Sequence, residues 1–503
     1  MARGFLFPDH LEANMYYPTL EEVKKCQNEG TLLPVYREIV ADLETPVSAF
    51  LKISRGGYSF LLESVEGGER LARYSFIGTE PYRVLATKTE DSVNPLPIIA
   101  EELQKCKMVP VADLPRFCGG AVGYLGYEVV TRFEKLPSPA SDPMGLPEAL
   151  FMFVDTMLVF DHITHKIKVL SHVHLDGDIE KEYQKAVDKI DNLVDRLSQP
   201  IQPDQAAKPS ISHRNKPLSS NFSRKEFEVG VNKIKQYITE GEAIQVVLSQ
   251  RLAQPVDAAP FEIYRALRSL NPSPYMFFLD FNDFQIIGAS PEILVRVEDG
   301  MVMTRPLAGT RRRGEDQAED FMLEQELRSN EKECAEHIML VDLGRNDIGR
   351  VSEPGTVQVS DLMNVERYSH VMHLVTHVQG KLRHDLDIFD ALQACFPAGT
   401  VAGAPKIRAM EIIAELEPEK RGPYAGAAGY FSFSGNMDMA IAIRTMVVSK
   451  GSAYVQAGCG VVYDSVPEQE YQETMNKAQA LLKAIDQAES TAVANRGNHA
   501  VVD

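Results

Sequence analysis

Runs of apolar residues, some continuous and some alternating with polar residues, occur in both halves of the chain and predict β-strands. These strands are expected at 58–64, 150–154, 167–171, 245–250, 275–279 and 284–287. Apolar residues spaced three and four positions apart predict helices between the strands. The helices are expected at 179–197, 223–240, from Asn330 to Gly344, and from Pro467 onward. The pattern therefore predicts a protein of mixed α and β structure.

Three of the expected helices carry additional signals. The helix at 179–197 has one apolar stripe, which indicates contact with a core. Gly344 is expected to end the helix that starts at Asn330, because glycine is common just past a helix C-terminus. Pro467 suits the first turn of the last helix, because the backbone N–H that proline lacks would have no partner within the helix at that position. The members of the stripe are Tyr183, Val187, Ile190, Val194 and Leu197.

Residues 198–221 are polar, rich in proline and without apolar periodicity, which is typical of a linker. We place a domain boundary there, with one domain at 1–205 and a second at 222–490. Residues 488–503 are expected to form a frayed tail.

The composition, with 44% hydrophobic and 24% charged residues over 503 positions, is that of a globular protein large enough for more than one domain. The formal net charge of −19 opposes non-specific binding to nucleic acid or anionic lipid. The six cysteines form no Cys-x-x-Cys pair, which indicates reduced thiols and a cytoplasmic location. No signal sequence and no run of 18 apolar residues occurs, so neither secretion nor membrane spanning is expected.

Two of the expected helices carry pairs of glutamates three residues apart. Glu333 and Glu336 lie on the first helix, beside His337, and Glu470 and Glu473 lie on the second. This spacing puts each pair on one helix face. Four carboxylates from two helices could share one Mg2+, which prefers oxygen ligands and usually keeps bound water. Such pairs more commonly face solvent, so the spacing alone leaves both interpretations open.

The glycine-rich run at 119–126 is similar in spacing to a dinucleotide-binding loop. The residues that follow it, Tyr-Glu-Val-Val, are a poor helix start, and a dinucleotide loop requires a helix at that point. We therefore interpret the run as sheet packing or a turn.

Three longer motifs identify a family. They are Ser-Pro-Glu-Ile-Leu at 290–294, Arg-Pro-Leu-Ala-Gly-Thr-Arg-Arg-Arg-Gly at 305–314, and Phe-Pro-Ala-Gly-Thr-Val-Ala-Gly-Ala-Pro-Lys at 396–406. With the first acidic helix between them, they make the chain resemble the chorismate-utilising enzymes, and among these the large subunits of anthranilate synthase. The resemblance is strong over the C-terminal half of the chain and weaker over the N-terminal half.

The resemblance implies an α+β fold of mixed, largely antiparallel sheets covered by helices, with two interleaved subdomains. Residues 1–205 would then form a regulatory domain and residues 222–490 the chorismate-binding catalytic domain. The implied reaction is Mg2+-dependent conversion of chorismate and ammonia to anthranilate and pyruvate through an aminodeoxyisochorismate intermediate, the first committed step of tryptophan biosynthesis. Because the chain shows no amidotransferase domain with an activated cysteine, ammonia is expected from a partner subunit that hydrolyses glutamine.

The resemblance also assigns roles to particular residues. Glu292 would be the general acid that protonates the leaving ring hydroxyl, and His373 would serve the second step, the elimination of pyruvate. Thr310 and Gln245 complete the implied catalytic set. The implied Mg2+ site consists of Glu333, Glu336, Glu470 and Glu473, with Glu336 and Glu473 as the direct ligands. The implied substrate contacts are Gly309, Thr310, Thr400, Tyr424, Arg444, Gly458 and Gly460.

Two of these assignments have alternatives. Arg444 is expected in an apolar strand at 439–446, where an unpaired charge is unfavourable, so it could form a structural ion pair or bind an anion. His373 lies near His370 and His377 at spacings that would place three zinc ligands on one helix face. If this segment is a strand, only His373 and His377 share a face.

Two positions favour ammonia as the nucleophile. Aminodeoxychorismate synthases of the family commonly have a nucleophilic Lys before the Gly-Thr pair, whereas this chain has Ala308. Isochorismate and salicylate synthases activate water with a Lys where this chain has Gln245, and an amide cannot act as that base. A departure from the family pattern is Ala402, where the family often has Ser, and it affects the details of that loop.

Residues 61–64 and 271–276 resemble the motifs with which anthranilate synthases bind tryptophan as a feedback inhibitor. Without the family, a strand followed by a proline-containing turn would explain both segments. The implied tryptophan contacts are Glu63, Ser64, Asn271, Pro274, Tyr275 and Met276.

Two rival functions remain. The first is an aminodeoxychorismate synthase large subunit, which Ala308 disfavours. The second is a catalytically inactive amino-acid-binding paralogue, which the four metal-site glutamates, Glu292 and Arg444 together disfavour, because a binding module would not need them all.

Overall fold

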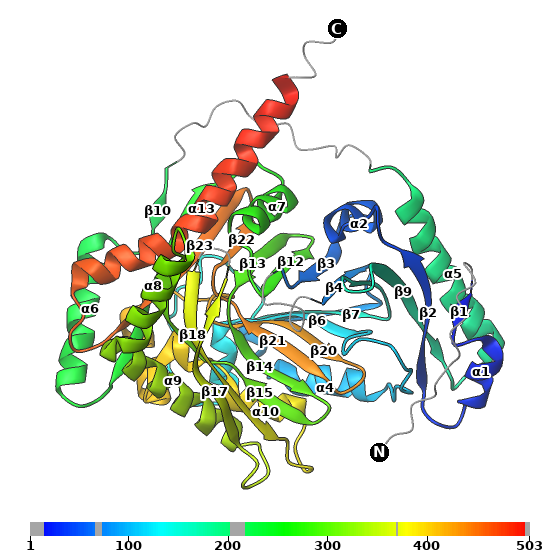
Figure 1. The fold of residues 1–503 in the computed structure, drawn as a ribbon, viewed down its shortest axis with the longest axis horizontal. Helices are drawn as coiled ribbons and strands as arrows, with labels where there is room; N and C mark the ends of the chain where they lie inside the picture. Colours follow the sequence, from blue (N-terminus) through cyan, green and yellow to red (C-terminus); the bar gives the residue numbers. More distant parts are fainter. Residues whose placement is uncertain (1–14, 66–72, 202–216, 369–370, 498–503) are drawn as a thin grey trace.

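The computed structural model describes residues 15–65, 73–201, 217–368 and 371–497. It shows two large sheets packed face to face, with helices over their outer sides (Figure 1). Residues 202–216 of the expected linker lie outside the described residues, and so does His370.

Within the described residues, thirteen strands form the first sheet. In spatial order they are β1 (Tyr16–Tyr17), β2 (Leu32–Val40), β9 (Lys166–His174), β8 (Thr156–Asp161), β4 (Tyr74–Thr79), β3 (Tyr58–Glu63), β12 (Tyr275–Phe281), β13 (Phe284–Ser290), β22 (Thr445–Ser449), β23 (Ser452–Val461), β11 (Gln245–Pro255) and β10 (Ser219–Ser220), with β19 (Gly403–Ala404) beside β11.

The second sheet has ten strands in the same described part of the chain. Their order is β16 (Leu307–Arg312), β18 (Val371–Lys381), β15 (Met301–Thr304), β14 (Ile293–Glu298), β21 (Met437–Ile441), β20 (Ala427–Ser432), β6 (Gly120–Leu125), β7 (Ala149–Val154) and β5 (Arg83–Thr87), with β17 (Gln358–Arg367) beside β18.

The helices are amphipathic or capped segments that cover these sheets. They are α1 (Leu20–Lys25), α2 (Pro46–Ile53), α4 (Pro95–Gln104), α5 (Ile179–Ser198), α6 (Arg224–Thr239), α7 (Pro260–Leu270), α8 (Gln317–Ser329), α9 (Glu331–Gly349), α10 (Ile388–Cys395), α11 (Gly399–Ala402), α12 (Lys406–Leu416) and α13 (Pro467–Gly497), together with the 3₁₀ segments η1 (Thr89–Asp91) and η2 (Tyr127–Arg132). The paired strands are antiparallel, so the predicted α+β class with largely antiparallel sheets is confirmed.

Both sheets draw strands from the two sides of the expected domain boundary. In the first sheet β3 pairs with β12, and Glu63 lies opposite Met276. In the second sheet β6 pairs with β20, and Val122 lies opposite Tyr430. The two halves of the sequence are therefore interleaved in space, as the resemblance implies.

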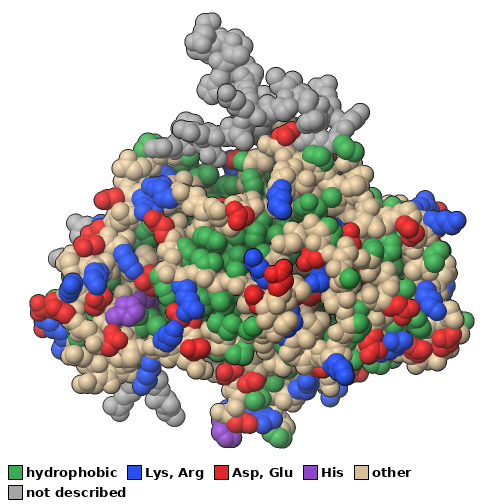
Figure 2. All heavy atoms as spheres, turned by 180° about the vertical axis from the view of Figure 1, so that it is seen from behind, with side chains coloured by type: hydrophobic (Ala, Val, Ile, Leu, Met, Phe, Trp, Pro, Cys, Tyr) green, Lys and Arg blue, Asp and Glu red, His purple; other side chains and the backbone are tan. Residues whose placement is uncertain are grey.

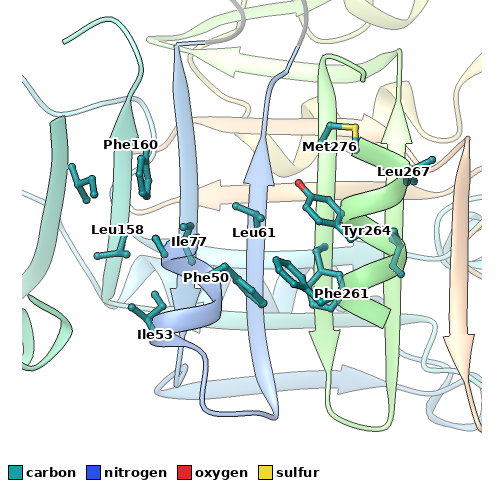
Figure 3. Packing of buried hydrophobic residues seen from close by; sticks show 14 of the residues in the cluster. Phe50, Ile53, Leu61, Ile77, Leu158, Phe160, Phe261, Tyr264, Leu267 and Met276 are labelled. Atoms are coloured by element: carbon teal, nitrogen blue, oxygen red, sulfur yellow. The ribbon is translucent and has the colours of Figure 1, made fainter. Parts of the chain in front are cut away.

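Three apolar layers follow from the period-two alternation of the strands. Phe60 and Phe277 point between the two sheets. Their neighbours Leu61 and Phe278 point to the opposite face, where α2 and α7 cover the first sheet (Figure 3). There the rings of Phe50 and Phe261 stack with centroids 4.5 Å apart. The outer face of the second sheet packs against α4, α9, α10 and α12. The site residues thus rest on a rigid frame of two sheets.

The structure confirms most of the predicted elements. Each of the six expected strands is present, and the expected helices correspond to α5, α6, α9 and α13. Ser223 caps α6 by accepting a hydrogen bond from the N–H of Glu226. The run at 119–126 forms the buried strand β6, in agreement with its interpretation as sheet packing.

Two predicted helix ends are wrong. Gly344 lies inside α9 rather than at its end. Glycine at this position serves close packing, because a Cβ there would stand 3.1 Å from Cγ2 of Thr304 and 3.3 Å from Cγ of Pro306. The tail expected from residue 488 is helical as far as Gly497, since Ala488 is buried in the core beside Ile485. Residues 498–503 lie outside the described residues.

The surface and the helices carry two further observations. On the face opposite to that of Figure 1, acidic and basic side chains are interspersed rather than gathered into one basic patch (Figure 2). In the described part of the chain, no helix combines the length and the apolar character needed to cross a membrane. The six cysteines are all free.

Candidate active site

Three of the four expected catalytic residues, Gln245, Thr310 and His373, lie on β11, β16 and β18, which approach α9. Gln245, the first residue of β11, donates a hydrogen bond from Nε2 to Oε1 of Glu336 on α9 at 3.1 Å. A Cβ on Gly460 would stand 2.5 Å from Nε2 of Gln245, so glycine is required where β23 passes this amide. The Gln245 amide is thereby fixed between a carboxylate and a strand.

Gly309, Thr310 and His373 form a second group on β16 and β18. Nδ1 of His373 lies 2.9 Å from the carbonyl oxygen of Gly309 and 3.1 Å from the Thr310 hydroxyl. Because a carbonyl oxygen only accepts, Nδ1 carries the proton and Nε2 is left as an acceptor. Burial lowers the pKa of His373, against the effect of the Gly309 carbonyl. The imidazole is therefore neutral near pH 7 and can accept a proton at Nε2.

Gly309 also links this group to α9. Its φ of +65° is left-handed, and a Cβ there would lie 2.8 Å from Leu327 and 3.1 Å from Oε2 of Glu333. Only glycine combines that backbone with such a close approach. Glu333 in turn accepts a hydrogen bond from Arg311 at 3.2 Å.

Glu292 lies immediately before β14 and is buried, with 7% of its surface exposed. Its backbone is fixed because its carbonyl accepts the N–H of Ile441 at 3.0 Å. Burial raises the pKa of its carboxyl to about 8, while the Thr400 hydroxyl and the charge of Lys477 oppose the rise. Glu292 and Thr400 line one cavity. The Thr400 hydroxyl is buried and has no hydrogen bond of good geometry among the described residues.

The glutamates of α9 and α13 influence one another electrostatically. Burial, and then the charges of Glu333 and Glu473, raise the pKa of Glu336. Burial and the charge of Glu473 likewise raise the pKa of Glu470, whose Oε2 is buried without a partner among the described residues. Mutually repelling carboxylates, one of which has an oxygen without a partner among the described residues, are donors of the type that a hard cation such as Mg2+ binds.

As they stand, these carboxylates are not gathered around one point. Within the described ranges, no group of three or more His, Cys, Asp or Glu side chains is close enough together to hold a metal ion. Glu473 is exposed and pairs with Lys477 at 2.7 Å. The donor type, carboxylate oxygens alone, is the one that Mg2+ prefers.

Lys477 is a site residue that the sequence motifs did not reveal. Besides Glu473, its Nζ contacts the carbonyl oxygen of Gly458 at 3.0 Å. Its positive charge also opposes the rise in the pKa of Glu292 and of Glu336, which connects the candidate acid electrostatically with the glutamates of α9. The available signal was its position four residues after Glu473, a spacing that places both on one helix face.

Arg444 is not inside a strand, contrary to the expectation for 439–446. β21 ends at Ile441 and β22 begins at Thr445, and between them the chain crosses from one sheet to the other. Arg444 occupies this crossing with a left-handed φ of +50°. The strands on both sides are buried and apolar, so nothing in the run apart from Arg444 itself marks the crossing.

The guanidinium of Arg444 has no ion pair and no hydrogen bond to the described residues. Burial lowers the pKa of Arg444, and the nearby Tyr424 and Glu473 act against that effect. A half-buried cation without an anionic partner is unfavourable unless a ligand completes it. This arrangement favours the binding of a carboxylate over the alternative of a structural ion pair.

Tyr424 is buried beside Gly458. A Cβ on Gly458 would stand 2.7 Å from the Tyr424 hydroxyl, so the tyrosine contacts the backbone of β23 directly. His377, on the same face of β18 as His373, lies 3.9 Å from Glu366. Because the segment is a strand, the zinc interpretation on a helix does not apply to it.

The two expected tryptophan motifs lie side by side on β3 and at the start of β12. One pocket between the sheets is lined by Glu63, Ser64, Pro274, Tyr275 and Met276. Asn271 is the C-cap of α7 and is not among the residues that line this pocket.

Two of the expected tryptophan contacts point their side chains away from the pocket. The Glu63 carboxylate accepts hydrogen bonds from Arg268 at 2.9 Å and from the Tyr264 hydroxyl at 2.5 Å, both on α7. Met276 lies on that same helix-covered face (Figure 3). Their backbones line the pocket, whereas Ser64 and Tyr275 alternate to the other face of the sheet.

The sequence motifs also missed a charged group in this pocket. Asp438 accepts hydrogen bonds from Arg296 at 3.0 Å and from the Tyr275 hydroxyl at 3.1 Å, and Arg116 lies 3.4 Å from it. Two arginines thus share one carboxylate, which leaves a net positive charge in the pocket. These residues come from β14, β21 and a loop before β6, so no local pattern connects them.

Residues 57–483 match the family of chorismate binding enzymes. The chain is 52% identical over 491 residues to anthranilate synthase component 1 of Acetivibrio thermocellus, covering 94% of this chain and 99% of that relative. It is 48% identical over 498 residues to anthranilate synthase component 1 of Aquifex aeolicus, with coverages of 94% and 98%. Among solved structures, anthranilate synthase component I of Streptococcus pneumoniae superimposes with a TM-score of 0.74 at 39% identity, covering 88% of this chain and 98% of that chain. The resemblance in the motifs is therefore confirmed, and the chain belongs to the chorismate binding enzymes, in the branch of anthranilate synthase component 1.

Proposed function

We propose that this enzyme converts chorismate and ammonia to anthranilate and pyruvate with bound Mg2+, as the first committed step of tryptophan biosynthesis. The observation that carries the proposal is the buried carboxyl of Glu292, whose pKa is raised to about 8, together with the guanidinium of Arg444, which has no partner among the described residues. A protonated carboxyl near pH 7 is the group that a leaving ring hydroxyl requires.

In the first step, ammonia attacks the ring and the hydroxyl departs as water after it takes the proton of Glu292. Arg444 supplies a positive charge for a substrate carboxylate, and its guanidinium can form two parallel hydrogen bonds to one. Tyr424 and the adjoining Gly458 backbone form the wall beside it. These groups hold the ring so that the hydroxyl faces Glu292 and Thr400.

The choice of nucleophile follows from two side chains. Ala308 provides no amine for covalent attack. The Gln245 amide is engaged with Glu336 at 3.1 Å and cannot remove a proton from water. Ammonia, which needs no base to become nucleophilic, is the nucleophile that this site accommodates.

In the second step, a ring proton is removed and pyruvate departs, which makes the ring aromatic. His373 is suited to the removal because its Nδ1 is held by the Gly309 carbonyl at 2.9 Å and its Nε2 is unprotonated. Thr310, next to it, can contact the substrate from the same strand.

Mg2+ would be held directly by Glu336 and Glu473, with Glu333 and Glu470 acting through water. When bound, the ion neutralises a ring carboxylate of the substrate and orients it. The support for this part is the oxygen-only donor set and the buried Oε2 of Glu470, which has no partner among the described residues.

Ammonia would come from a separate glutamine amidotransferase subunit, and the two chains would form a hetero-oligomer in the cytoplasm. The name of the relatives, component 1, supports the existence of a partner component. The six free cysteines suit a reducing compartment. Cys459, between the two glycines of β23, is buried and its pKa is raised by that burial, which is unlike a reactive thiolate.

Tryptophan would bind as feedback inhibitor in the pocket lined by Ser64, Pro274 and Tyr275. The net positive charge of Arg116, Arg296 and Asp438 suits the carboxylate of an amino acid. The aromatic and apolar lining, which includes Phe76 and Phe277, suits an indole ring.

Product identification tests the proposed function. The purified chain should form anthranilate and pyruvate from chorismate, Mg2+ and an ammonium salt, but none from glutamine until the partner subunit is added. Formation of aminodeoxychorismate without loss of pyruvate would instead support an aminodeoxychorismate synthase, and the absence of any turnover would support a binding paralogue.

A further inference from the structure

Among the residues that the structure describes, Arg421 is the largest fully buried side chain, with 1% of its surface exposed. Its guanidinium donates two hydrogen bonds to the Glu417 carboxylate at 2.8 and 2.7 Å. It donates two more to the carbonyl oxygens of Val401 at 2.7 Å and Val247 at 2.8 Å. Four of its five N–H groups therefore have partners, which lie on three separate segments.

Two of these segments, those of Val401 and Val247, each carry a residue of the candidate active site. Val401 follows Thr400 on α11, and Val247 lies two residues after Gln245 on β11. The Glu417 carboxylate also accepts hydrogen bonds from the N–H and the hydroxyl of Ser249, both at 2.8 Å. A single guanidinium thus sets the relative positions of α11 and β11.

The same guanidinium lies between two aromatic rings. Its carbon stands 4.6 Å from the ring centroid of Tyr127 and 5.7 Å from that of Tyr424. Cation–π attraction of this kind strengthens in a desolvated site. The hydroxyl of Tyr424 lies against Gly458 of β23. The guanidinium of Arg421, which lies over the ring of the same tyrosine, therefore helps to fix the position of Tyr424 against β23.

The N-terminal half of the chain holds the backbone of this arginine. The buried carboxylate of Glu128, on η2, accepts the N–H of Arg421 at 2.7 Å and that of Gly422 at 3.0 Å. The N–H of Tyr127 donates to the carbonyl of Gly422 at 2.8 Å. Burial raises the pKa of Glu128 to about 7. The turn before Tyr424 is therefore enclosed by a segment from the other half.

We propose that Arg421, held by Glu128 and Glu417, is a positioning residue that fixes Thr400, Tyr424 and the start of β11 in the geometry needed for the reaction on chorismate. It touches none of the reacting atoms. The inference rests on the proposed function only in its activity assay.

The alternative is that this network serves stability alone. A buried ion pair contributes little net stability compared with apolar groups of the same size, whereas loss of one partner leaves an uncompensated charge. Removing both charges together therefore separates the two interpretations, because stability can recover while the geometry does not.

The test compares Arg421→Met with the double variant Arg421→Met/Glu417→Gln, in which the glutamine oxygen still accepts from Ser249. The single variant should lose thermal stability. The double variant should regain most of that loss, yet its kcat/KM for chorismate should stay roughly 10–100-fold below that of the parent, the effect of a site displaced by about 1 Å. Calorimetry should show weaker chorismate binding in the same variant.

The double variant Arg132→Met/Glu148→Gln is the matched control. It removes the pair, joined at 2.7 Å, between Arg132 at the end of η2 and Glu148 just before β7. Neither residue hydrogen-bonds to Arg421, so this variant should retain the parental kcat/KM. Should the first double variant not fold, Arg421→Lys keeps the charge but cannot reach both carbonyl oxygens, and it should fold with a similarly reduced kcat/KM.

A folded Arg421→Lys or double variant with parental kcat/KM and chorismate affinity would overturn the proposal, and so would an equal loss in the control. If the parent itself formed no anthranilate, the proposed function would fail, while chorismate affinity would still test the positioning role.

Discussion

The backbone of Tyr275 pairs with that of Ser290, two residues before the buried carboxyl of Glu292. The strand that follows Glu292 carries Arg296, whose guanidinium donates to the Tyr275 hydroxyl at 3.0 Å. Tyr275 is thus connected to residues on both sides of Glu292, and a ligand that displaced Tyr275 would disturb both contacts. The candidate regulatory pocket and the candidate acid are therefore connected by one strand pairing and one hydrogen bond.

Replacement of the acid should affect chemistry more than binding. Glu292→Gln keeps the shape of the side chain but has no proton to donate, so we expect kcat to fall by roughly 10²–10⁴-fold. Steady-state kinetics with ammonium should show this loss, and calorimetry should show little change in Mg2+ affinity. Turnover near the parental level would move the acid role to another residue.

The pH profile of the same pair of proteins gives an independent check. With a pKa of about 8, Glu292 loses its proton as the pH rises through 8. When the rate is divided by the concentration of unprotonated ammonia, kcat/KM of the parent should therefore decline above about pH 8. The residual activity of Glu292→Gln should lack this decline.

The raised pKa of Glu292 also predicts a change in stability with pH. Between its ordinary value of 4.5 and about 8, the folded state keeps a proton that the unfolded state has released. The free energy of unfolding therefore falls as the pH rises through this window, by up to about 1.4 kcal/mol per pH unit from this group, and levels off above it.

Thermal unfolding without Mg2+ or chorismate measures this slope. The Tm of Glu292→Gln relative to the parent should rise from pH 5 to pH 8, because glutamine has no proton to lose. A constant difference across that range would contradict the buried, protonated carboxyl.

The metal prediction concerns both acidic helices. Glu336→Ala or Glu473→Ala should abolish Mg2+-dependent activity, because each removes a proposed direct ligand. Mg2+ should raise the Tm of the parent, since a ligand that binds only the folded state stabilises it, and the rise should be lost in both variants. Glu331→Ala, at an exposed position of α9, is the control and should retain both effects. Activity of either ligand variant at ordinary Mg2+ concentrations would exclude the shared-cation site.

The sequence reveals features whose signals are local. Strands such as β12 alternate or run apolar over their length, and α5 carries a complete apolar stripe, so both could be predicted from their own residues. The pairing of β3 with β12 joins residues some 200 positions apart, and nothing within either strand specifies that partner. In the sequence, only the resemblance to the family motifs indicates that these two segments lie together.

The missed residues share one physical cause. Glu417 and Arg421 are four residues apart and look like an ordinary exposed pair, yet both are fully buried because α12 ends inside the molecule. Lys477 does pair with the exposed Glu473, but its contact with the Gly458 carbonyl of β23 is created by tertiary packing. Conversely, the crossing at Arg444 is hidden in sequence, since apolar strands flank it on both sides. Burial of a charge depends on tertiary packing, which local spacing does not report.

The prediction on feedback follows from the relationship between Tyr275 and Ser290. Ser64 directly follows β3 and lines the pocket with Tyr275, so the phenyl ring of Ser64→Phe should occupy space that the proposed tryptophan site requires. We expect this variant to bind tryptophan weakly and to resist inhibition, with uninhibited activity close to that of the parent. Ser198→Phe, which adds the same ring at an exposed serine at the end of α5, should remain as sensitive to tryptophan as the parent.

Linkage makes the mechanism testable from both sites. If tryptophan moves Tyr275 and thereby the segment of Glu292, it must weaken chorismate binding, with a coupling free energy of about 1–3 kcal/mol. Chorismate must then weaken tryptophan binding by the same factor. Calorimetric titration of tryptophan into Glu292→Gln, which turns over too slowly to consume its substrate, should show that factor on adding saturating chorismate. The variant Tyr275→Phe loses the hydroxyl that contacts Arg296 and Asp438, so it should bind tryptophan with reduced coupling. Equal tryptophan affinity with and without chorismate, or a Ser64→Phe protein inhibited as strongly as its parent, would remove the regulatory role from this pocket.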